Sequence, residues 1–239
     1  MHVKLAIITG GSKGLGFSLV KTYCNHGFQV ISISRSSSTF KHPNLIATIA
    51  FDLSRIDFFK ELEKQLFNHI SIKVINEVIL INNAGTLGNI KTNENNSIKN
   101  IDTTIKLNLT APLALTSIIT NRFKNTKTIV YNISSGAALK PYFGWANYCA
   151  TKAGLALATK TIAIEQEKNS TFEIFSIIPG IIDTEMQTKI RKSNKSDFKQ
   201  IERFIQLKKE NLLLAPDAVA EKIYTIRYEK YKSGISITL

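Results

Sequence analysis

The sequence is poor in the residues that build disulfide frameworks and metal sites. Its 239 residues include two cysteines, Cys24 and Cys149, and both fall in helical patterns, where a small buried thiol is the ordinary interpretation. All four histidines precede residue 70 and lack the paired spacing of metal ligands. We therefore expect neither a disulfide nor a metal site.

Long hydrophobic runs are also missing. No uninterrupted apolar run approaches the roughly 20 residues that a membrane-spanning helix needs. No charged leader followed by an apolar stretch and a cleavage site precedes the first expected strand, which begins at Val3. The sequence therefore predicts a reduced, cytoplasmic protein with no membrane partner.

Acidic residues are scarce relative to basic ones. The formal net charge is +13 and the pI is about 9.7, values that are compatible with a nucleic acid, a membrane surface or an anionic ligand as partner. The basic residues are scattered, however, with no run of five and no aromatic–basic motif. We interpret the charge as compositional and expect no nucleic acid partner.

Short apolar runs alternate with helical patterns along the whole chain, without a break in composition. This alternation predicts one α/β domain, residues 1–239, with a mainly parallel sheet and helices on both faces. The expected strands are 3–8, 28–33, 45–51, 74–81, 128–133, 172–178 and 235–239. The main expected helices are 17–27, 56–70, 98–123, 145–167, 183–210 and one that opens at Pro216.

A glycine-rich turn, Thr9–Gly16, lies between the first strand and the first helix. This arrangement aims backbone N–H groups and a helix N-terminus at phosphate. A hydrolase nucleophile elbow also fits Gly10–Gly14, but it needs a histidine far downstream and none follows His69. A P-loop needs Lys-Ser/Thr where the sequence has Phe17-Ser18. The turn therefore predicts a dinucleotide site.

The end of the second strand indicates which dinucleotide binds. A cofactor without a 2′-phosphate is usually held by an acidic side chain roughly 20 residues past the glycines. Here the sequence reads Ser34-Arg35-Ser36, with no carboxylate nearby. Arg35 and Lys13 offer two cations for a 2′-phosphate, although both also suit ordinary surface positions. The sequence therefore predicts NADP(H).

Tyr148 and Lys152 are four residues apart, so on a helix they share one face. A nearby ammonium favours the phenolate and is expected to lower the pKa of Tyr148. Ser135 supplies a hydroxyl just after the expected strand 128–133. Together these groups suit carbonyl reduction, whereas the pair alone also fits a half-buried tyrosine beside a solvated lysine.

With Thr9–Gly16, Asn82–Gly85, Asn108, Ser135, Tyr148, Lys152 and Pro179-Gly180 in this order, the chain resembles the short-chain dehydrogenase/reductase family. The resemblance implies a Rossmann-like, doubly wound sheet of seven strands with NAD(P)H along its carboxyl edge. It also implies that Tyr148 donates the proton and that Lys152 holds the nicotinamide ribose. Ser135 would orient the carbonyl, and Asn108 would support a water relay to Lys152.

The resemblance extends to the cofactor contacts. Asp52 is expected to meet the adenine, and Asn83 the cofactor ribose region. Ile181 and Thr184 are expected to meet the carboxamide. The full set of expected contacts is Thr9, Gly10, Ser12, Lys13, Gly14, Leu15, Gly16, Arg35, Asp52, Leu53, Asn83, Ala84, Gly85, Tyr148, Lys152, Pro179, Gly180, Ile182, Thr184 and Met186.

Within the family, the segments 141–149 and 183–187 resemble the sepiapterin reductase branch and its bacterial benzil reductase relatives. By that likeness Tyr142, Trp145 and Met186 line an apolar substrate pocket together with Ser135 and Tyr148. Core packing is the alternative for Trp145 and Met186. Sepiapterin reductases carry an aspartate near the C-terminus, where this chain has Ser236-Ile237-Thr238. An aromatic diketone or another small carbonyl substrate is therefore expected in preference to a pterin.

Two classes of function remain. One is an NADPH-dependent carbonyl reductase, and the other is a catalytically silent dinucleotide-sensing protein on the same fold. The presence of Ser135, Tyr148 and Lys152 together favours the enzyme. The family's usual pairing through the helices 98–123 and 145–167 implies a homodimer or homotetramer.

Overall fold

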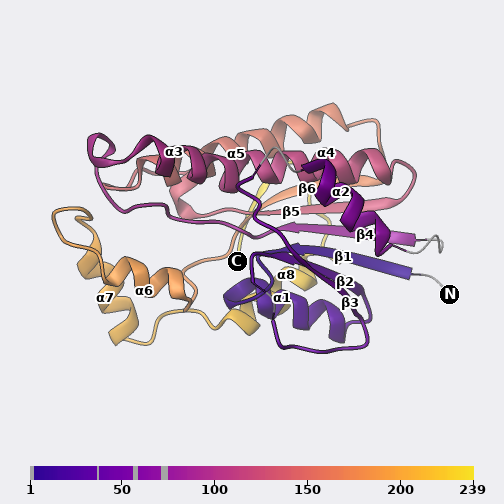
Figure 1. Cartoon of the computed structure of the whole chain (residues 1–239), viewed down its shortest axis with the longest axis horizontal. Coiled ribbons are helices and arrows are strands. Elements are labelled where there is room, and N and C mark those ends of the chain that lie inside the picture. The colour runs from indigo at the N-terminus through magenta and orange to yellow at the C-terminus, as the bar shows by residue number, and fades with distance from the viewer. Residues whose placement is uncertain (1–2, 37, 56–58, 71–74) are drawn as a thin grey trace.

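The computed structural model describes residues 3–36, 38–55, 59–70 and 75–239, and these residues form a layered α/β structure around one sheet (Figure 1). The sheet has seven strands in the order β3-β2-β1-β4-β5-β6-β7, and every neighbouring pair is parallel. This topology confirms the predicted Rossmann-like, doubly wound fold. No helix within the described residues is both long and apolar enough to cross a membrane.

The strands are short runs of mostly apolar residues, as expected for strands buried on both faces of a parallel sheet. Val74 of the predicted fourth strand lies outside the described residues. The strands are β1 (Val3–Thr9), β2 (Gln29–Ser34), β3 (Leu45–Ala50), β4 (Ile75–Asn82), β5 (Lys127–Ile133), β6 (Phe172–Ile178) and β7 (Ser236–Thr238).

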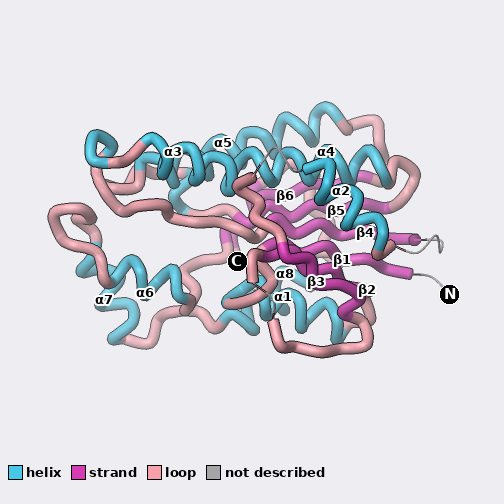
Figure 2. Tube along the Cα trace, in the orientation of Figure 1, coloured by secondary structure: helices cyan, strands magenta, loops and turns pink. Residues whose placement is uncertain are grey.

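Helices cover both faces of the sheet, and Figure 2 shows the two layers. Residues 56–58 of the predicted helix 56–70 lie outside the described residues. The helices are α1 (Gly14–Asn25), α2 (Phe59–Asn68), α3 (Ile98–Ile105), α4 (Ala111–Arg122), α5 (Ala146–Glu165), α6 (Glu185–Arg191), α7 (Ile201–Lys209) and α8 (Pro216–Ile226).

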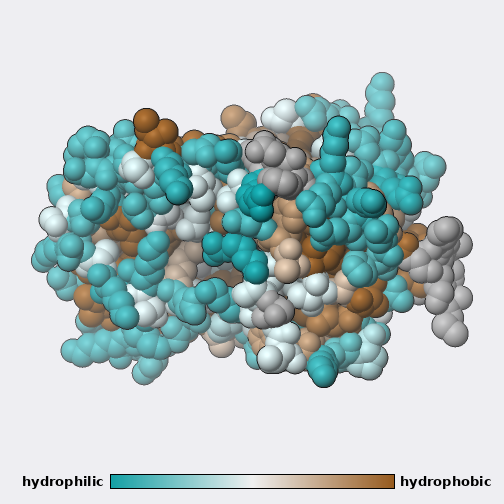
Figure 3. All heavy atoms as spheres, in the orientation of Figure 1, coloured by the Kyte–Doolittle hydropathy of each residue, from teal (hydrophilic) through white to brown (hydrophobic). Residues whose placement is uncertain are grey.

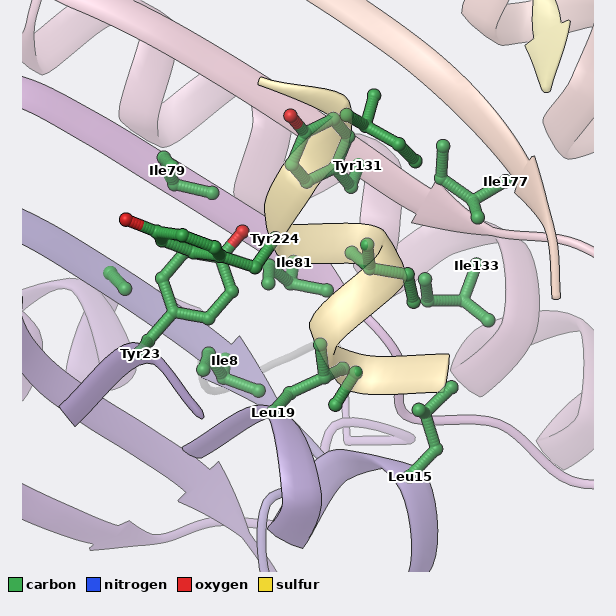
Figure 4. Close-up of a cluster of buried hydrophobic side chains, with 14 of the residues drawn as sticks. Ile8, Leu15, Leu19, Tyr23, Ile79, Ile81, Tyr131, Ile133, Ile177 and Tyr224 are labelled. Carbon is green, nitrogen blue, oxygen red and sulfur yellow. The ribbon is translucent and has the colours of Figure 1, made fainter. Parts of the chain in front are cut away.

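Two hydrophobic clusters hold these layers together. On one face, α1 and α8 pack on the sheet through a cluster in which Leu19 and Tyr224 lie with Ile8 and Ile79 (Figure 4). On the other face, α2, α4 and α5 pack on the alternate side chains of the same strands. Because the strands are all parallel, their carboxyl ends meet at one edge of the sheet, and packing on both faces fixes that edge as a place for a site.

The expected helix 98–123 is interrupted. A π-helical segment, Lys106–Thr110, separates α3 from α4, and the N–H of Ala111 bonds back to the carbonyl of Lys106, five residues earlier. Pro112 follows directly and has no N–H to continue the regular ladder. The chain thereby accommodates one extra residue at Asn108, which is fully buried.

The expected helix 183–210 is also divided, into α6 and α7. Ser, Asn and Asp side chains in the connecting segment 192–200 compete with the helical backbone for hydrogen bonds. The Ser193 hydroxyl donates to the carbonyl of Ile190 at 2.6 Å, and the carbonyl of Asn194 accepts from the N–H groups of Asp197 and Phe198. In Figure 1 the two helices form a separate lobe beside the carboxyl edge of the sheet.

Candidate active site

The glycine turn after β1 is closely packed against the end of β4. Gly10 has a φ of +71°, and a Cβ there would lie 2.9 Å from the Asn83 Nδ2 and 3.0 Å from the Ala84 Cα. A Cβ on Gly16 would lie 2.1 Å from the carbonyl oxygen of Gly10. Only glycine fits at both positions, so the turn brings its backbone to the carboxyl edge with no side chain in the way.

Thr9 joins this turn to the segment that follows β4. Its Oγ1 accepts hydrogen bonds from the N–H groups of Asn83 and Ala84, both at 2.9 Å. The Asn83 Nδ2 donates to the Thr9 carbonyl at 2.9 Å. Thr9 and Asn83 therefore tie the glycine turn to half-buried Ala84 and Gly85. The predicted cofactor cleft, called the cleft below, is the carboxyl edge of the sheet between this turn and the segments after β4 and β6.

The predicted 2′-phosphate site lies at the ends of β1, β2 and β3. The Ser36 hydroxyl donates to the Ser12 hydroxyl at 3.2 Å, which ties the glycine turn to the segment carrying exposed Arg35. Burial raises the pKa of Asp52, but hydrogen bonds from Ser54 and the charge of Arg35 outweigh it and hold that pKa below its usual value. The neighbouring Leu53 is buried. Arg35 thus supplies a cation next to the expected adenine contact.

Lys13, the second predicted cation, forms an ion pair with Glu185 at the start of α6. The adjacent Gly14 has a φ of +54°, and a Cβ there would lie 3.2 Å from the Cγ2 of Thr184. The glycine turn and the start of α6 therefore meet across the cleft. Glu185 therefore compensates part of the Lys13 charge, and no sequence pattern indicates this pairing.

The segment after β6 forms the opposite wall. Gly180 follows Pro179 with a φ of +80°, and Ile182 pairs with Leu214 through a parallel bridge. The N–H of Leu214 donates to the carbonyl of Ile181 at 2.9 Å. These bonds fix the path of the chain that leads to Thr184 and Met186, both half-buried at the cleft.

The predicted catalytic side chains come together at the carboxyl end of β5 and the first turns of α5. Tyr148 is 6% exposed, and a hydrogen bond with the Ser135 side chain reaches its hydroxyl. The Lys152 Nζ lies 5.7 Å from the centre of the Tyr148 ring and donates to the Ile133 carbonyl at 2.7 Å. The spacing of 148 and 152 thus places a phenol and an ammonium on one buried helix face.

The pKa values differ from the sequence expectation. Burial raises the pKa of Tyr148 to about 12, and the hydrogen bond with Ser135 lowers it only in part. Burial lowers the pKa of Lys152 to about 8. The predicted lowering of the Tyr148 pKa by Lys152 is therefore wrong in this structure, because burial of the phenol dominates and the ammonium is directed to the Ile133 carbonyl.

Asn108, in the π-helical segment, positions the chain beside Lys152. Its Oδ1 accepts from the N–H of Thr86 and its Nδ2 donates to the Thr86 carbonyl, both at 2.8 Å. Its Nδ2 also donates to the Thr151 hydroxyl at 3.2 Å. A Cβ on Gly85 would lie 3.3 Å from the Asn108 Oδ1 and 3.8 Å from the Lys152 Nζ, which places all three residues together.

A family profile described as short chain dehydrogenase matches residues 4–195. The chain belongs to this family. It is therefore an oxidoreductase of a class that acts on carbonyl and alcohol groups with a nicotinamide dinucleotide.

Individual relatives in the short chain dehydrogenase family match over nearly the whole chain. A benzil reductase ((S)-benzoin forming) from Bacillus subtilis (strain 168) is 37% identical, over 97% of this chain and 96% of the relative. A sepiapterin reductase from Rattus norvegicus is 28% identical, over 98% of this chain and 95% of the relative. The solved structure of the KRED1-Pglu enzyme shares the fold with a TM-score of 0.84, at 24% identity, over 98% of this chain and 100% of that one.

Of the predicted substrate-pocket residues, Trp145 is buried within a third hydrophobic cluster. Its ring stacks on Phe198 at 4.6 Å between centroids and lies 4.9 Å from Tyr142 and 5.6 Å from Tyr148. Trp145 therefore packs the core of this region, as the alternative interpretation proposed. Tyr142 and Met186 are half-buried at the edge of the same cluster.

Sequence reasoning missed several members of this third cluster. Phe198 and Phe204 come from the lobe of α6 and α7, and Leu87 and Ile90 from the segment after β4. The only signal for Phe198 in the sequence is that it is a single aromatic residue in a charged, polar stretch. Its role becomes visible only when the lobe is placed against Trp145.

Proposed function

We propose that the protein is an NADPH-dependent carbonyl reductase that reduces a ketone or an aromatic 1,2-diketone in the cytoplasm. The observation that carries the proposal is the arrangement of buried Tyr148 and Lys152 beside half-buried Ser135 at the carboxyl end of β5. The similarity to a benzil reductase over 97% of this chain supports the diketone. A catalytically silent sensor has no need of this set.

The cleft suits a dinucleotide. The close approach of Gly10 and Gly16 to backbone leaves a turn free of side chains, next to the N-terminus of α1. The glycine turn with Ser12, the segment 83–85 and the segment 179–184 would hold the cofactor. NADPH supplies the hydride for carbonyl reduction when it is bound.

Tyr148 is the proton donor in this proposal. With a pKa of about 12 its phenol keeps its proton at neutral pH, so it is available to a carbonyl oxygen that gains negative charge. Ser135 orients the same oxygen by hydrogen bonding beside the phenol. Lys152 holds the nicotinamide ribose in this proposal, and its buried ammonium is anchored by the Ile133 carbonyl.

The preference for NADPH rests on the end of β2. Arg35 is exposed beside Ser36 and Ser12, and the sequence Ser34-Arg35-Ser36 has no acidic residue to bind a ribose 2′-hydroxyl. A guanidinium and two hydroxyls match a phosphate better than they match a hydroxyl. Lys13 contributes less than predicted, because it is paired with Glu185.

The half-buried rings and thioether at the cleft favour an apolar substrate. Tyr142 and Met186 offer aromatic and polarizable surface next to Tyr148. A pterin ring needs a charged partner for its polar edge, because an unpaired buried polar group costs about 1–3 kcal/mol. Near the C-terminus this chain offers Thr238, an exposed residue of β7 with a neutral hydroxyl.

We also propose that two copies pair through α4 and α5. Leu157 and Ile164 on α5 are 67% and 73% exposed, and a groove of about 390 Å³ runs beside Leu113, Gly154 and Ile162. Apolar side chains so exposed on α5, beside a groove that reaches Leu113 of α4, are typical of an interface. Light scattering checks the mass: the monomer mass of 26.7 kDa in solution would contradict the pairing.

The deciding experiment measures NADPH oxidation with benzil and with sepiapterin in parallel. We expect turnover of benzil with a higher kcat/KM than that of sepiapterin. Efficient turnover of sepiapterin alone would contradict the proposed diketone substrate but would leave the carbonyl reductase function standing. Tight NADPH binding without turnover of either compound, or of a wider panel of ketones and quinones, would favour the sensor.

A further inference from the structure

A cavity of about 550 Å³ lies between α6 and the segment 89–91 and includes none of the predicted pocket residues. One wall is formed by Glu185, Thr188 and Lys189 of α6 and by Lys192, the residue that caps its C-terminus. The facing wall is the segment 89–91. The cavity is completed by Ser193, Asn194 and Asp197.

Direct contacts hold these walls in place. The Lys189 Nζ donates to the carbonyl of Gly88, which joins α6 to the facing segment. The N–H of Lys91 donates to the carbonyl of Gly144 at 3.1 Å. A Cβ on Gly144 would lie 2.0 Å from the carbonyl oxygen of Asp197, so these two backbones are in close contact. The cavity is therefore framed on several sides by fixed backbone.

The cavity carries an excess of positive charge. Three ammonium groups, those of Lys91, Lys189 and Lys192, face two carboxylates, those of Glu185 and Asp197. Glu185 is already paired with Lys13 outside the cavity. Within the described part of the chain, neither Lys91 nor Lys192 has a carboxylate within ion-pair distance. An anion entering the cavity would thus meet uncompensated cations.

The cavity adjoins the third hydrophobic cluster at Ile90. This residue lines the cavity and also belongs to the hydrophobic cluster that contains Trp145 and Tyr148. On α6, Glu185 lines the cavity while its neighbour Met186 packs on the same cluster. These residues place the cavity next to the cluster that contains Tyr148.

We propose that the cavity binds an anionic substituent of the substrate, so that the preferred substrates are aryl ketones or diketones that carry a carboxylate away from the reacting carbonyl. The inference rests on the proposed carbonyl reductase function. It assigns to Lys91 and Lys192 a specificity role that is separate from proton transfer. In this proposal the hydroxyls of Thr188 and Ser193 and the amide of Asn194 can donate hydrogen bonds to the carboxylate of the substrate.

The kinetic test compares 4-carboxybenzil with benzil. We expect the ratio of their kcat/KM values to fall about three- to tenfold in Lys192→Gln and further in a variant that also carries Lys91→Gln, since one charge contact at a partly solvated site is worth up to about a factor of ten. Lys168→Gln is the matched control, because it removes the same charge beyond the far end of α5. An unchanged ratio in the double variant would overturn the proposal.

An equilibrium test keeps this inference separate from the proposed function. Trp145 is the only tryptophan of the chain and packs beside Ile90, so its fluorescence reports on this region. We expect 4-carboxybenzil to bind more tightly than benzil, with an advantage that disappears in the double variant and shrinks at high salt. If 4-carboxybenzil binds in this way but is not turned over, only the proposed reductase function is rejected. If both compounds bind equally tightly, only the proposed anion-binding cavity is rejected.

Discussion

Thr9→Val tests whether the junction of β1 and β4 shapes the cofactor cleft. The side chain is 2% exposed, and its hydroxyl oxygen lies 2.9 Å from the amide nitrogens of both Asn83 and Ala84. A methyl group needs about 3.5–4.0 Å from such atoms. Valine therefore removes both hydrogen bonds and pushes the Asn83–Ala84 backbone away by at least about 0.6 Å.

Two effects destabilise the Thr9→Val variant: two N–H groups lose their acceptor, and packed backbone is displaced. The two N–H groups are half-buried, so we assign the lower end of the range of about 1–3 kcal/mol to each. Displacement of packed backbone adds about 1 kcal/mol at the low end of the overpacking range. We expect the free energy of unfolding to fall by about 3 kcal/mol. The control, Thr9→Ser, keeps the hydroxyl and loses one buried methyl, worth about 0.8 kcal/mol.

Urea unfolding at fixed protein concentration measures the stability, and a fluorescence titration measures the NADPH Kd. Thr9→Val is expected to raise the Kd at least about fivefold, which corresponds to about 1 kcal/mol. Thr9→Ser should leave the Kd within about twofold of the parent value. If both variants behave alike in both assays, the hydroxyl does not position the cleft and the reasoning fails.

Three further outcomes are expected around the site. Arg35→Asp should weaken NADPH at least about tenfold relative to NADH in equilibrium binding, because it replaces a charge-assisted contact worth about 1.5–3 kcal/mol with a repulsion; equal use of both cofactors by the parent enzyme would contradict the assignment. Tyr148→Phe should abolish turnover and preserve the NADPH Kd, and substantial remaining turnover would move the proton source elsewhere. The Lys152 pKa of about 8, lowered by burial, means that the ammonium is present below that pH and lost above it, so kcat for reduction should fall as the pH rises through about 8; a rate that stays constant to pH 10 would refute this.

Much of the fold could be predicted from the sequence because the signals are local. Each strand is a run of apolar residues long enough to be buried on both faces. Within the glycine turn, Gly10 has a φ of +71° and a Cβ on Gly16 would meet the Gly10 carbonyl oxygen. The spacing of Tyr148 and Lys152 needs only a helix to bring them together. These features do not depend on distant parts of the chain.

The remaining features depend on contacts between distant segments. The ion pair of Lys13 with Glu185 joins positions 172 residues apart, and no pattern near either residue indicates it. The stacking of Phe198 on Trp145 arises only when the lobe docks. The raised pKa of Tyr148 follows from how completely the fold covers the phenol, and spacing along a helix does not report burial.

The π-helical segment Lys106–Thr110 changes the angular phase of the helix that contains it. Because one residue is added to the turn, every later side chain points about 100° away from where an uninterrupted α-helix would place it. Before the segment, Asn100 and Thr104 face the chain at Gly88 and Asn89, beside the cleft. After it, Leu115 and Ile119 face the sheet. The two halves of this helical stretch therefore contact different parts of the fold, the segment 88–89 before the π-helical residues and the sheet after them.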